Sequence, residues 1–131
     1  MLIDASAITA IFATEAGFER LVSALDTAEA PVMIPLGMWE SAVALARIFN
    51  RELSTAADDL KAWIDANGIS ILPVDAETAR LAIDAHARYG KGRHPAKLNF
   101  GDCFAYAAAR QHGVPLLFKG EDFTLTDIRA A

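Results

Sequence analysis

Short apolar runs alternate with longer helical patterns along the whole chain. The runs are rich in branched apolar residues and are brief enough to be buried strands. They fall at Met1 to Ile3, Val32 to Pro35, Ile69 to Val74 and Pro115 to Phe118, with a weaker fifth run near Thr126 to Arg129. Strands that alternate with helices are typical of a parallel sheet. The pattern therefore predicts an α/β fold with helices on both faces of the sheet.

Apolar positions at helical spacing fill the gaps between these runs. Two stripes follow the i, i+3, i+4, i+7 pattern over 18–25 and 42–49, and a third covers 56–64. A further helix is expected to run from a cap at Asp75 to Tyr89. The last helix is expected to begin near Asp102 and to end before the sequence Gly113-Val114-Pro115.

The composition fits one compact domain. The chain has 131 residues, of which 53% are apolar. A chain of this size buries roughly two-thirds of the surface that it exposes when unfolded. No apolar run approaches the roughly 18 residues of a membrane helix, and the N-terminus lacks the features of a signal peptide. We therefore expect a single domain over 1–131, without a membrane partner, in the cytoplasm by default.

The charge balance narrows the possible contacts with nucleic acid. With 12 basic and 17 acidic residues the net charge is -5, which argues against a general nucleic-acid-binding surface. A local basic patch remains, because Lys91, Arg93, His94 and Lys97 lie close together in the sequence. Their stretch holds two glycines and a proline and cannot form a regular helix. It is either a solvated loop or a local site for phosphate groups.

Four acids stand at positions suited to a functional site. Ligands of open parallel sheets bind beyond the carboxyl ends of the strands, and Asp4 and Asp122 follow the first and fourth expected strands. Glu40 lies in the first turn of its expected helix, roughly opposite the apolar stripe. Asp102 begins a helix that is apolar all round, which indicates a buried helix. A buried carboxylate costs several kcal/mol unless a cation offsets it, so these acids are candidate site residues.

Each acid taken alone has a structural explanation as well. Asp102 suits the N-cap of a helix, Glu40 a surface position in a first turn, and Asp122 a turn after glycine. Asp4 has few such roles, because it closes a buried strand. The joint pattern favours one site over four separate structural roles.

The order and flanks of these acids resemble those of PIN-domain ribonucleases. The segments that carry the resemblance are Asp4 with Ser6, the mid-chain Glu40, Gly101-Asp102 before an apolar helix, and Phe118-Lys119-Gly120-Glu121-Asp122-Phe123. Within that superfamily the chain is most similar to the VapC toxins, whose subgroups carry stretches similar to 89–95 and 98–107. The resemblance spans nearly the whole chain.

The resemblance implies a PIN fold with a five-stranded parallel sheet, and a metal-dependent endoribonuclease toxin of a type II toxin-antitoxin module. The family's acidic residues fall on Asp4, Glu40, Asp102 and Asp122. Ser6 matches a small hydroxyl residue that would steady a metal ligand or a metal-bound water. Glu121 stands where many relatives have Asn or Asp, so either Glu121 or Asp122 is the fourth acid. We favour Asp122.

Four gathered carboxylates suit Mg²⁺ or Mn²⁺, which prefer oxygen ligands. Such a cluster repels an anionic phosphate unless cations are bound, so the substrate is expected to require metal. We expect Asp4 and Asp102 to hold the principal ion, while Glu40 and Asp122 complete a second site or orient water. Water activated by the metal would then hydrolyse the RNA phosphodiester bond. RNA phosphates would be steered toward the metal by Lys91, Arg93 and Lys97.

The resemblance also implies partners. A cognate antitoxin of the VapB type would hold the toxin inactive, the toxin would form a homodimer, and operator DNA would be bound only through the antitoxin. The apolar stripes over 18–25 and 42–49 are candidate faces for these contacts, although core packing explains them equally.

Two other classes of function are weighed against a nuclease. A non-catalytic module that binds RNA or an antitoxin would keep the fold without turnover. A receiver-type phosphoacceptor domain needs an acid at the end of its central strand, near residues 50 to 60. This chain has a helical pattern there, with Asp58 and Asp59 inside it. The intact acid set favours the nuclease.

Overall fold

The computed structural model describes residues 1–131, which form ten helices and strands. They are β1 (Leu2–Ile3), α1 (Ala5–Phe12), α2 (Phe18–Asp26), β2 (Val32–Met33), α3 (Pro35–Ile48), α4 (Leu53–Ala66), β3 (Ser70–Ile71), α5 (Ala76–Tyr89), α6 (Phe100–His112) and β4 (Leu116–Leu117). The strands form one parallel four-stranded sheet in the order β3-β2-β1-β4. No helix is long and apolar enough to cross a membrane.

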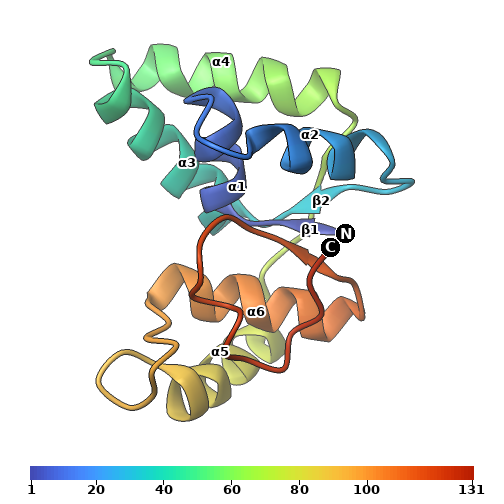
Figure 1. The fold of residues 1–131 in the computed structure, drawn as a ribbon, viewed down its shortest axis with the longest axis vertical. Coiled ribbons are helices and arrows are strands. Elements are labelled where there is room, and N and C mark those ends of the chain that lie inside the picture. The colour runs from blue at the N-terminus through green and yellow to red at the C-terminus, as the bar shows by residue number, and fades with distance from the viewer.

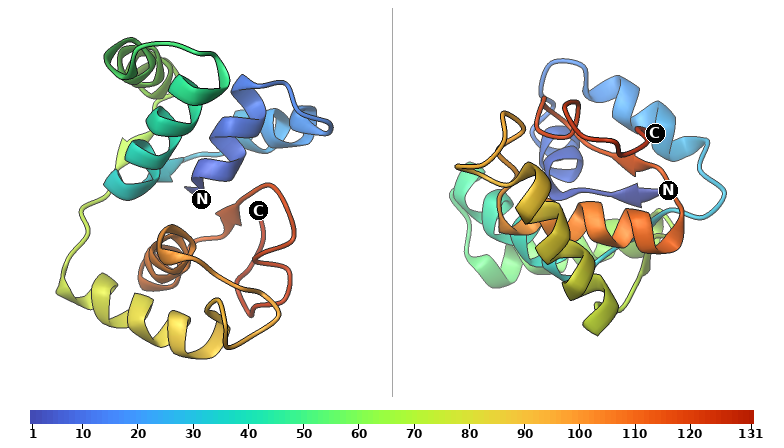
Figure 2. Two further views of the ribbon diagram at one scale, coloured as in Figure 1. Left: turned by 90° about the vertical axis from the view of Figure 1, so that its left-hand side faces the viewer. Right: turned by 90° about the horizontal axis from the view of Figure 1, so that it is seen from below.

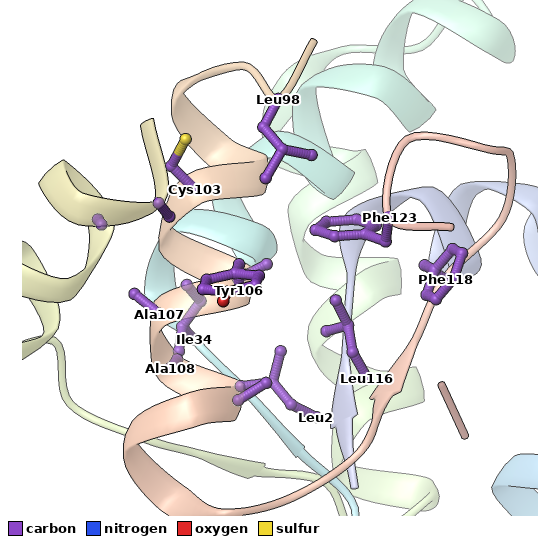
Figure 3. Packing of buried hydrophobic residues seen from close by; sticks show 14 of the residues in the cluster. Leu2, Ile34, Leu98, Cys103, Tyr106, Ala107, Ala108, Leu116, Phe118 and Phe123 are labelled. Carbon is purple, nitrogen blue, oxygen red and sulfur yellow. The ribbon is translucent and has the colours of Figure 1, made fainter. Parts of the chain in front are cut away.

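The sheet separates two layers of helices, as Figures 1 and 2 show. Helices α1 to α4 cover one face, and α5, α6 and the C-terminal segment cover the other. Successive side chains of a strand point to opposite faces, so the two residues of β1 and the two residues of β4 enter different cores. Leu2 and Leu116 enter the α5/α6 core, where they lie with Tyr106 (Figure 3). Ile3 and Leu117 enter the core under α1 to α4.

The predicted fifth strand near Thr126 is wrong, and the sheet has four strands. That segment keeps a single parallel bridge, between Leu116 and Ala130. Thr126 Oγ1 donates to the carbonyl of Phe123 at 2.8 Å and accepts from the amide of Ile128 at 3.3 Å. Such local hydrogen bonds between side chain and backbone compete with a strand ladder. The segment therefore forms bends and irregular backbone instead of a fifth strand.

One helix was not predicted, and two helix boundaries differ from the prediction. Helix α1 gives no periodic signal, because its residues are almost all apolar or small. Helix α3 begins at Pro35, which suits the first position of a helix, so Glu40 lies in its second turn rather than its first. Helix α6 begins at Phe100, so Asp102 is its third residue and Asn99 is its N-cap. The predicted cap at Asp75 is confirmed.

Candidate active site

The four candidate acids lie at one edge of the sheet, and three of them follow the carboxyl ends of neighbouring strands. Asp4 follows β1 and caps α1, Glu40 is carried by α3 after β2, and Asp122 lies in the segment after β4. Because β1 lies between β2 and β4, the segments that leave these strands start at one edge of the sheet. Asp102 reaches the same edge from the N-terminal turn of α6. This edge faces the viewer in the left panel of Figure 2.

Asp4 is a buried carboxylate whose orientation is fixed by Ser6. Only 5% of Asp4 is exposed. Its Oδ2 accepts hydrogen bonds from the amide of Ser6, at 2.9 Å, and from the Ser6 hydroxyl. The hydroxyl oxygen accepts a further bond from the amide of Lys119, at 3.0 Å, and so ties the end of β4 to the acid. Burial raises the pKa of Asp4 and the charge of Asp122 raises it further, whereas the Ser6 hydrogen bonds oppose the rise.

Asp102 serves helix α6 and the acid group at the same time. The Asn99 amide donates to Asp102 Oδ2 at 2.8 Å, and Asn99 Oδ1 accepts from the Asp102 amide at 3.0 Å, which completes a capping box. The structural explanation for Asp102 is thus correct in part. Burial, with the charges of Asp4 and Asp122, raises the pKa of Asp102 to about 6, against the opposing Asn99 hydrogen bond.

Glu40 lies against the backbone of Gly101 in the first turn of α6. The three atoms nearest to an imagined Cβ on Gly101 all belong to the Glu40 carboxyl group, with Cδ at 2.5 Å. Burial there, and the charges of Asp4 and Asp102, raise the pKa of Glu40 to about 7. Glu40, Asp4 and Asp102 therefore form one electrostatically coupled group.

Asp122 joins this group, and Glu121 does not. The charge of Asp122 contributes to the raised pKa values of both Asp4 and Asp102. The exposed Glu121 instead accepts a hydrogen bond from Thr124 Oγ1 at 3.3 Å within its own turn. Of the two acids that the sequence left open, Asp122 is the one whose charge acts on Asp4 and Asp102.

No basic side chain compensates these acids. The ion pairs of the protein lie elsewhere, on Arg51, Lys61, Arg80, Arg88 and Arg110. Lys119, the basic residue nearest to Asp122 in sequence, donates from Nζ to the carbonyl of Ala16. The group is thus rich in hard oxygen donors and lacks a counter-charge, which is the donor chemistry that Mg²⁺ and Mn²⁺ prefer. No three such side chains lie close enough together to hold an ion in this arrangement.

The basic stretch forms an irregular loop between α5 and α6. A bridge between Gly90 and Leu98 closes the loop, and Lys91, Arg93 and Lys97 within it are exposed. In Figure 1 the loop lies at the lower left, on the side where α6 begins. No ion pair involves these three residues. The structure therefore leaves their charges available to an external anion.

The sequence did not reveal the roles of two residues of the site, Asn99 and Gly101. The role of Asn99 could have been predicted, because an asparagine three residues before an acid has the spacing of a capping box. No sequence pattern could have predicted the space beside Gly101, because Glu40, which fills it, is far from Gly101 in sequence.

Comparison with known proteins agrees with the fold and identifies the family. The family model described as PIN domain matches residues 1–128, and this defines the class of the molecule. Ribonuclease VapC42 of Mycobacterium tuberculosis is 42% identical over 132 residues, covering 100% of this chain and 98% of its relative. Ribonuclease VapC of Mycolicibacterium smegmatis is 41% identical over 130 residues, covering 99% and 98%. The chain belongs to the PIN-domain family and, within it, to the VapC ribonucleases, the toxins of type II toxin-antitoxin modules.

Solved structures share the fold at lower sequence identity. The sarcin-ricin loop cleaving toxin VapC20 of Mycobacterium tuberculosis superposes with a TM-score of 0.79 at 16% identity, covering 99% of this chain and 97% of that one. A chain of a toxin-antitoxin complex from Klebsiella pneumoniae gives 0.67 at 19% identity, covering 96% and 92%. At these identities the likeness supports the fold alone.

Proposed function

We propose that this VapC-type ribonuclease is an endonuclease that depends on Mg²⁺ or Mn²⁺ and acts through Asp4, Glu40, Asp102 and Asp122. The observation that carries the proposal is the gathering of these carboxyl groups without a counter-charge. Burial first, and then the charges of neighbouring acids, raise the pKa values of Asp4, Glu40 and Asp102. Buried acids in this state require a cation before an anionic substrate can approach. On this proposal residues 1–131 act as one catalytic domain.

The residues of the chain would divide the work of holding metal and substrate. Asp4, held by Ser6, and Asp102, held by Asn99, present carboxylates with fixed orientations. We assign the principal ion to this pair, with Glu40 and Asp122 beside it. A bound divalent ion supplies charge neutralisation at the phosphoryl group and activation of water. Preorganised carboxylates limit the rearrangement needed when the ion binds.

We further propose that the basic loop receives the RNA backbone. Lys91, Arg93 and Lys97 are exposed and unpaired, and the loop leads directly into the helix that carries Asp102. Positive charge beside an acidic site draws a polyanion toward it in spite of the negative total charge. Substitution of these residues should weaken RNA binding and leave metal binding unchanged.

A cognate antitoxin of the VapB type is the partner that we propose for inhibition. The related Klebsiella chain comes from a toxin-antitoxin complex, and a similar fold occurs in FitAB bound to a DNA fragment. Exposed apolar side chains, among them Trp39, Phe49 and Ile83, offer contact area for an antitoxin or a second copy of the chain. We propose a homodimer, and operator DNA bound only through the antitoxin.

The test is cleavage of total cellular RNA by the purified, antitoxin-free protein with Mg²⁺ or Mn²⁺. EDTA and the variant Asp102→Asn should each abolish the products, because both remove part of the metal site. Asp58→Asn is the matched control, since Asp58 is exposed on α4 and outside the acid group. A folded protein that neither cuts RNA nor binds Mn²⁺ would contradict the proposal and favour a non-catalytic binding module.

A further inference from the structure

A glycine stands where the acid-bearing helices α3 and α6 come together. Gly101 is the second residue of α6, and it is buried. A Cβ built there would meet Oε1, Oε2 and Cδ of Glu40, with every contact below the 3.0 Å that real Cβ atoms respect. The carboxyl group of Glu40 thus occupies the volume that a side chain at position 101 would need.

This close approach is specific to the Glu40 carboxyl group. The nearest atoms are the end of a flexible side chain, and no backbone atom of α3 is among them. An added methyl group would therefore displace the Glu40 carboxylate rather than force the two helices apart. Gly37 offers a comparison, because a Cβ there would meet Met33 Cε at an ordinary 3.6 Å. Both glycines are buried in the first turn of a helix, and only Gly101 makes room for an acid.

The location of Glu40 determines its electrostatic coupling. Against the α6 backbone it lies close enough to Asp4 and Asp102 for their charges to act on it. A carboxylate pushed out of this space would turn toward solvent, where water screens those charges. Whether Glu40 belongs to the acid group thus depends on Gly101, which has no side chain of its own.

We propose that Gly101 is a positioning residue, whose missing side chain creates the space in which the Glu40 carboxylate joins Asp4 and Asp102. The consequence for cleavage rests on the proposed nuclease function, whereas the geometric statement does not. Residues that orient metal ligands affect metal affinity or activity by about 10- to 100-fold. Gly101 acts in this manner by leaving space instead of donating a hydrogen bond.

The experiment compares Gly101→Ala, Glu40→Ala, their combination and the control Gly37→Ala. For each protein we would measure RNA cleavage, Mn²⁺ affinity and the melting temperature. Gly101→Ala should lower cleavage and Mn²⁺ affinity by about 10- to 100-fold. Its melting temperature should be unchanged or higher, because alanine favours a helix over glycine. Gly37→Ala should retain cleavage and Mn²⁺ affinity close to those of the unmodified protein.

The combined variant decides whether Gly101 acts through Glu40. Once the Glu40 side chain is truncated, Gly101→Ala should have no further effect on cleavage or Mn²⁺ affinity. Equal losses in both backgrounds would overturn the proposal, as would full activity of Gly101→Ala. If Gly101→Ala alone fails to fold, the combined variant should fold, since the overlapping carboxylate is gone. Failure of both variants to fold would also overturn the proposal.

A crystal structure of metal-free Gly101→Ala separates the geometry from the chemistry. The Glu40 carboxylate should lie outside the acid group, whereas in Gly37→Ala it should stay beside position 101. A carboxylate that stays in place in Gly101→Ala would refute the positioning role even if cleavage were lost. If the unmodified protein neither binds Mn²⁺ nor cuts RNA, the nuclease proposal fails and this comparison still decides the role of Gly101.

Discussion

At the scale of single residues, the burial of the site's acids lowers the stability of the folded protein when they are ionised. Asp4, Glu40 and Asp102 all have pKa values above those of free carboxyl groups, with burial as the largest cause in each. A carboxyl group that binds its proton more tightly when folded opposes folding once it ionises. The metal-free protein should therefore be more stable toward unfolding in mildly acidic solution, where these acids are protonated, than at neutral pH.

The pH dependence of this cost can be measured on Glu40. Its pKa rises from 4.5 to about 7 on folding, so its contribution to stability falls as pH increases from 5 to 7.5. After allowance for screening, we expect Glu40→Gln in EDTA to gain about 1 kcal/mol relative to the unmodified protein between these pH values. Urea unfolding at pH 5 and pH 7.5 measures the difference.

Mn²⁺ binding should show the opposite trend with pH. The metal requires ionised carboxylates, so its apparent affinity should rise as Glu40 and Asp102 lose protons between about pH 5.5 and 7.5.

The urea series on Glu40→Gln has a matched control in Glu19→Gln, because Glu19 is exposed on α2. A stability difference between Glu40→Gln and the unmodified protein that does not change with pH would contradict the coupling described for Glu40.

At the scale of elements, the capping box of α6 links helix stability to the site. Asn99→Ala removes the acceptor for the Asp102 amide and should cost about 1 kcal/mol of unfolding free energy. It also alters the turn that fixes Asp102, so Mn²⁺ affinity and RNA cleavage should fall as well. Urea unfolding, Mn²⁺ titration and cleavage assays measure these three quantities.

A second capping box in the same protein provides the control for Asn99. Asp75 caps α5 through Thr78 and lies outside the acid group. Asp75→Ala should lower the unfolding free energy by a similar amount, about 1 kcal/mol, and leave Mn²⁺ affinity unchanged. If both variants lose stability and neither loses Mn²⁺ affinity, the cap of α6 has no part in holding Asp102 for metal.

The helices and strands also show which parts of the structure could be predicted from the sequence. Branched apolar runs located all four strands. The reason is clearest for β1 and β4, because a strand buried on both faces needs apolar residues at every position. The failures have local causes: the residues of α1 are too uniformly apolar to show a period, and the Thr126 side chain donates to the nearby carbonyl of Phe123. The acids could be found from their places after strands, but the partners of Asp102 and the space beside Gly101 required the folded structure.

At the scale of the whole molecule, the segment that carries Asp122 depends on distant anchors. Residues 118–129 contain no helix or strand. Phe123 is 3% exposed, and its ring centre lies 5.0 Å from that of Phe118 (Figure 3). Asp127 accepts a hydrogen bond from the Tyr106 hydroxyl of α6 and pairs with Arg88 of α5 at 3.2 Å. The helices of one layer thus hold the loop that brings Asp122 to the acid group.

This anchoring gives a prediction for Asp127→Ala. The variant leaves the hydroxyl of the buried Tyr106 without its acceptor, which should cost about 1 to 3 kcal/mol of unfolding free energy. With one anchor lost, backbone amides over 119–128 should exchange hydrogen faster, and RNA cleavage should fall because Asp122 is less well placed. Hydrogen exchange followed by mass spectrometry measures the first effect, and the cleavage assay measures the second.

Asp84→Ala is the matched control, since Asp84 pairs with the same Arg88 at 3.7 Å but forms no hydrogen bond or ion pair with the loop that carries Asp122. It should leave exchange over 119–128 and cleavage unchanged. If Asp127→Ala loses stability without faster exchange in that loop, Asp127 is not needed to hold the segment, and the buried Phe123 is the anchor that remains within it. The position of Asp122 would then depend on the apolar core under α6, and substitution of Phe123 would be the change that separates Asp122 from the other acids.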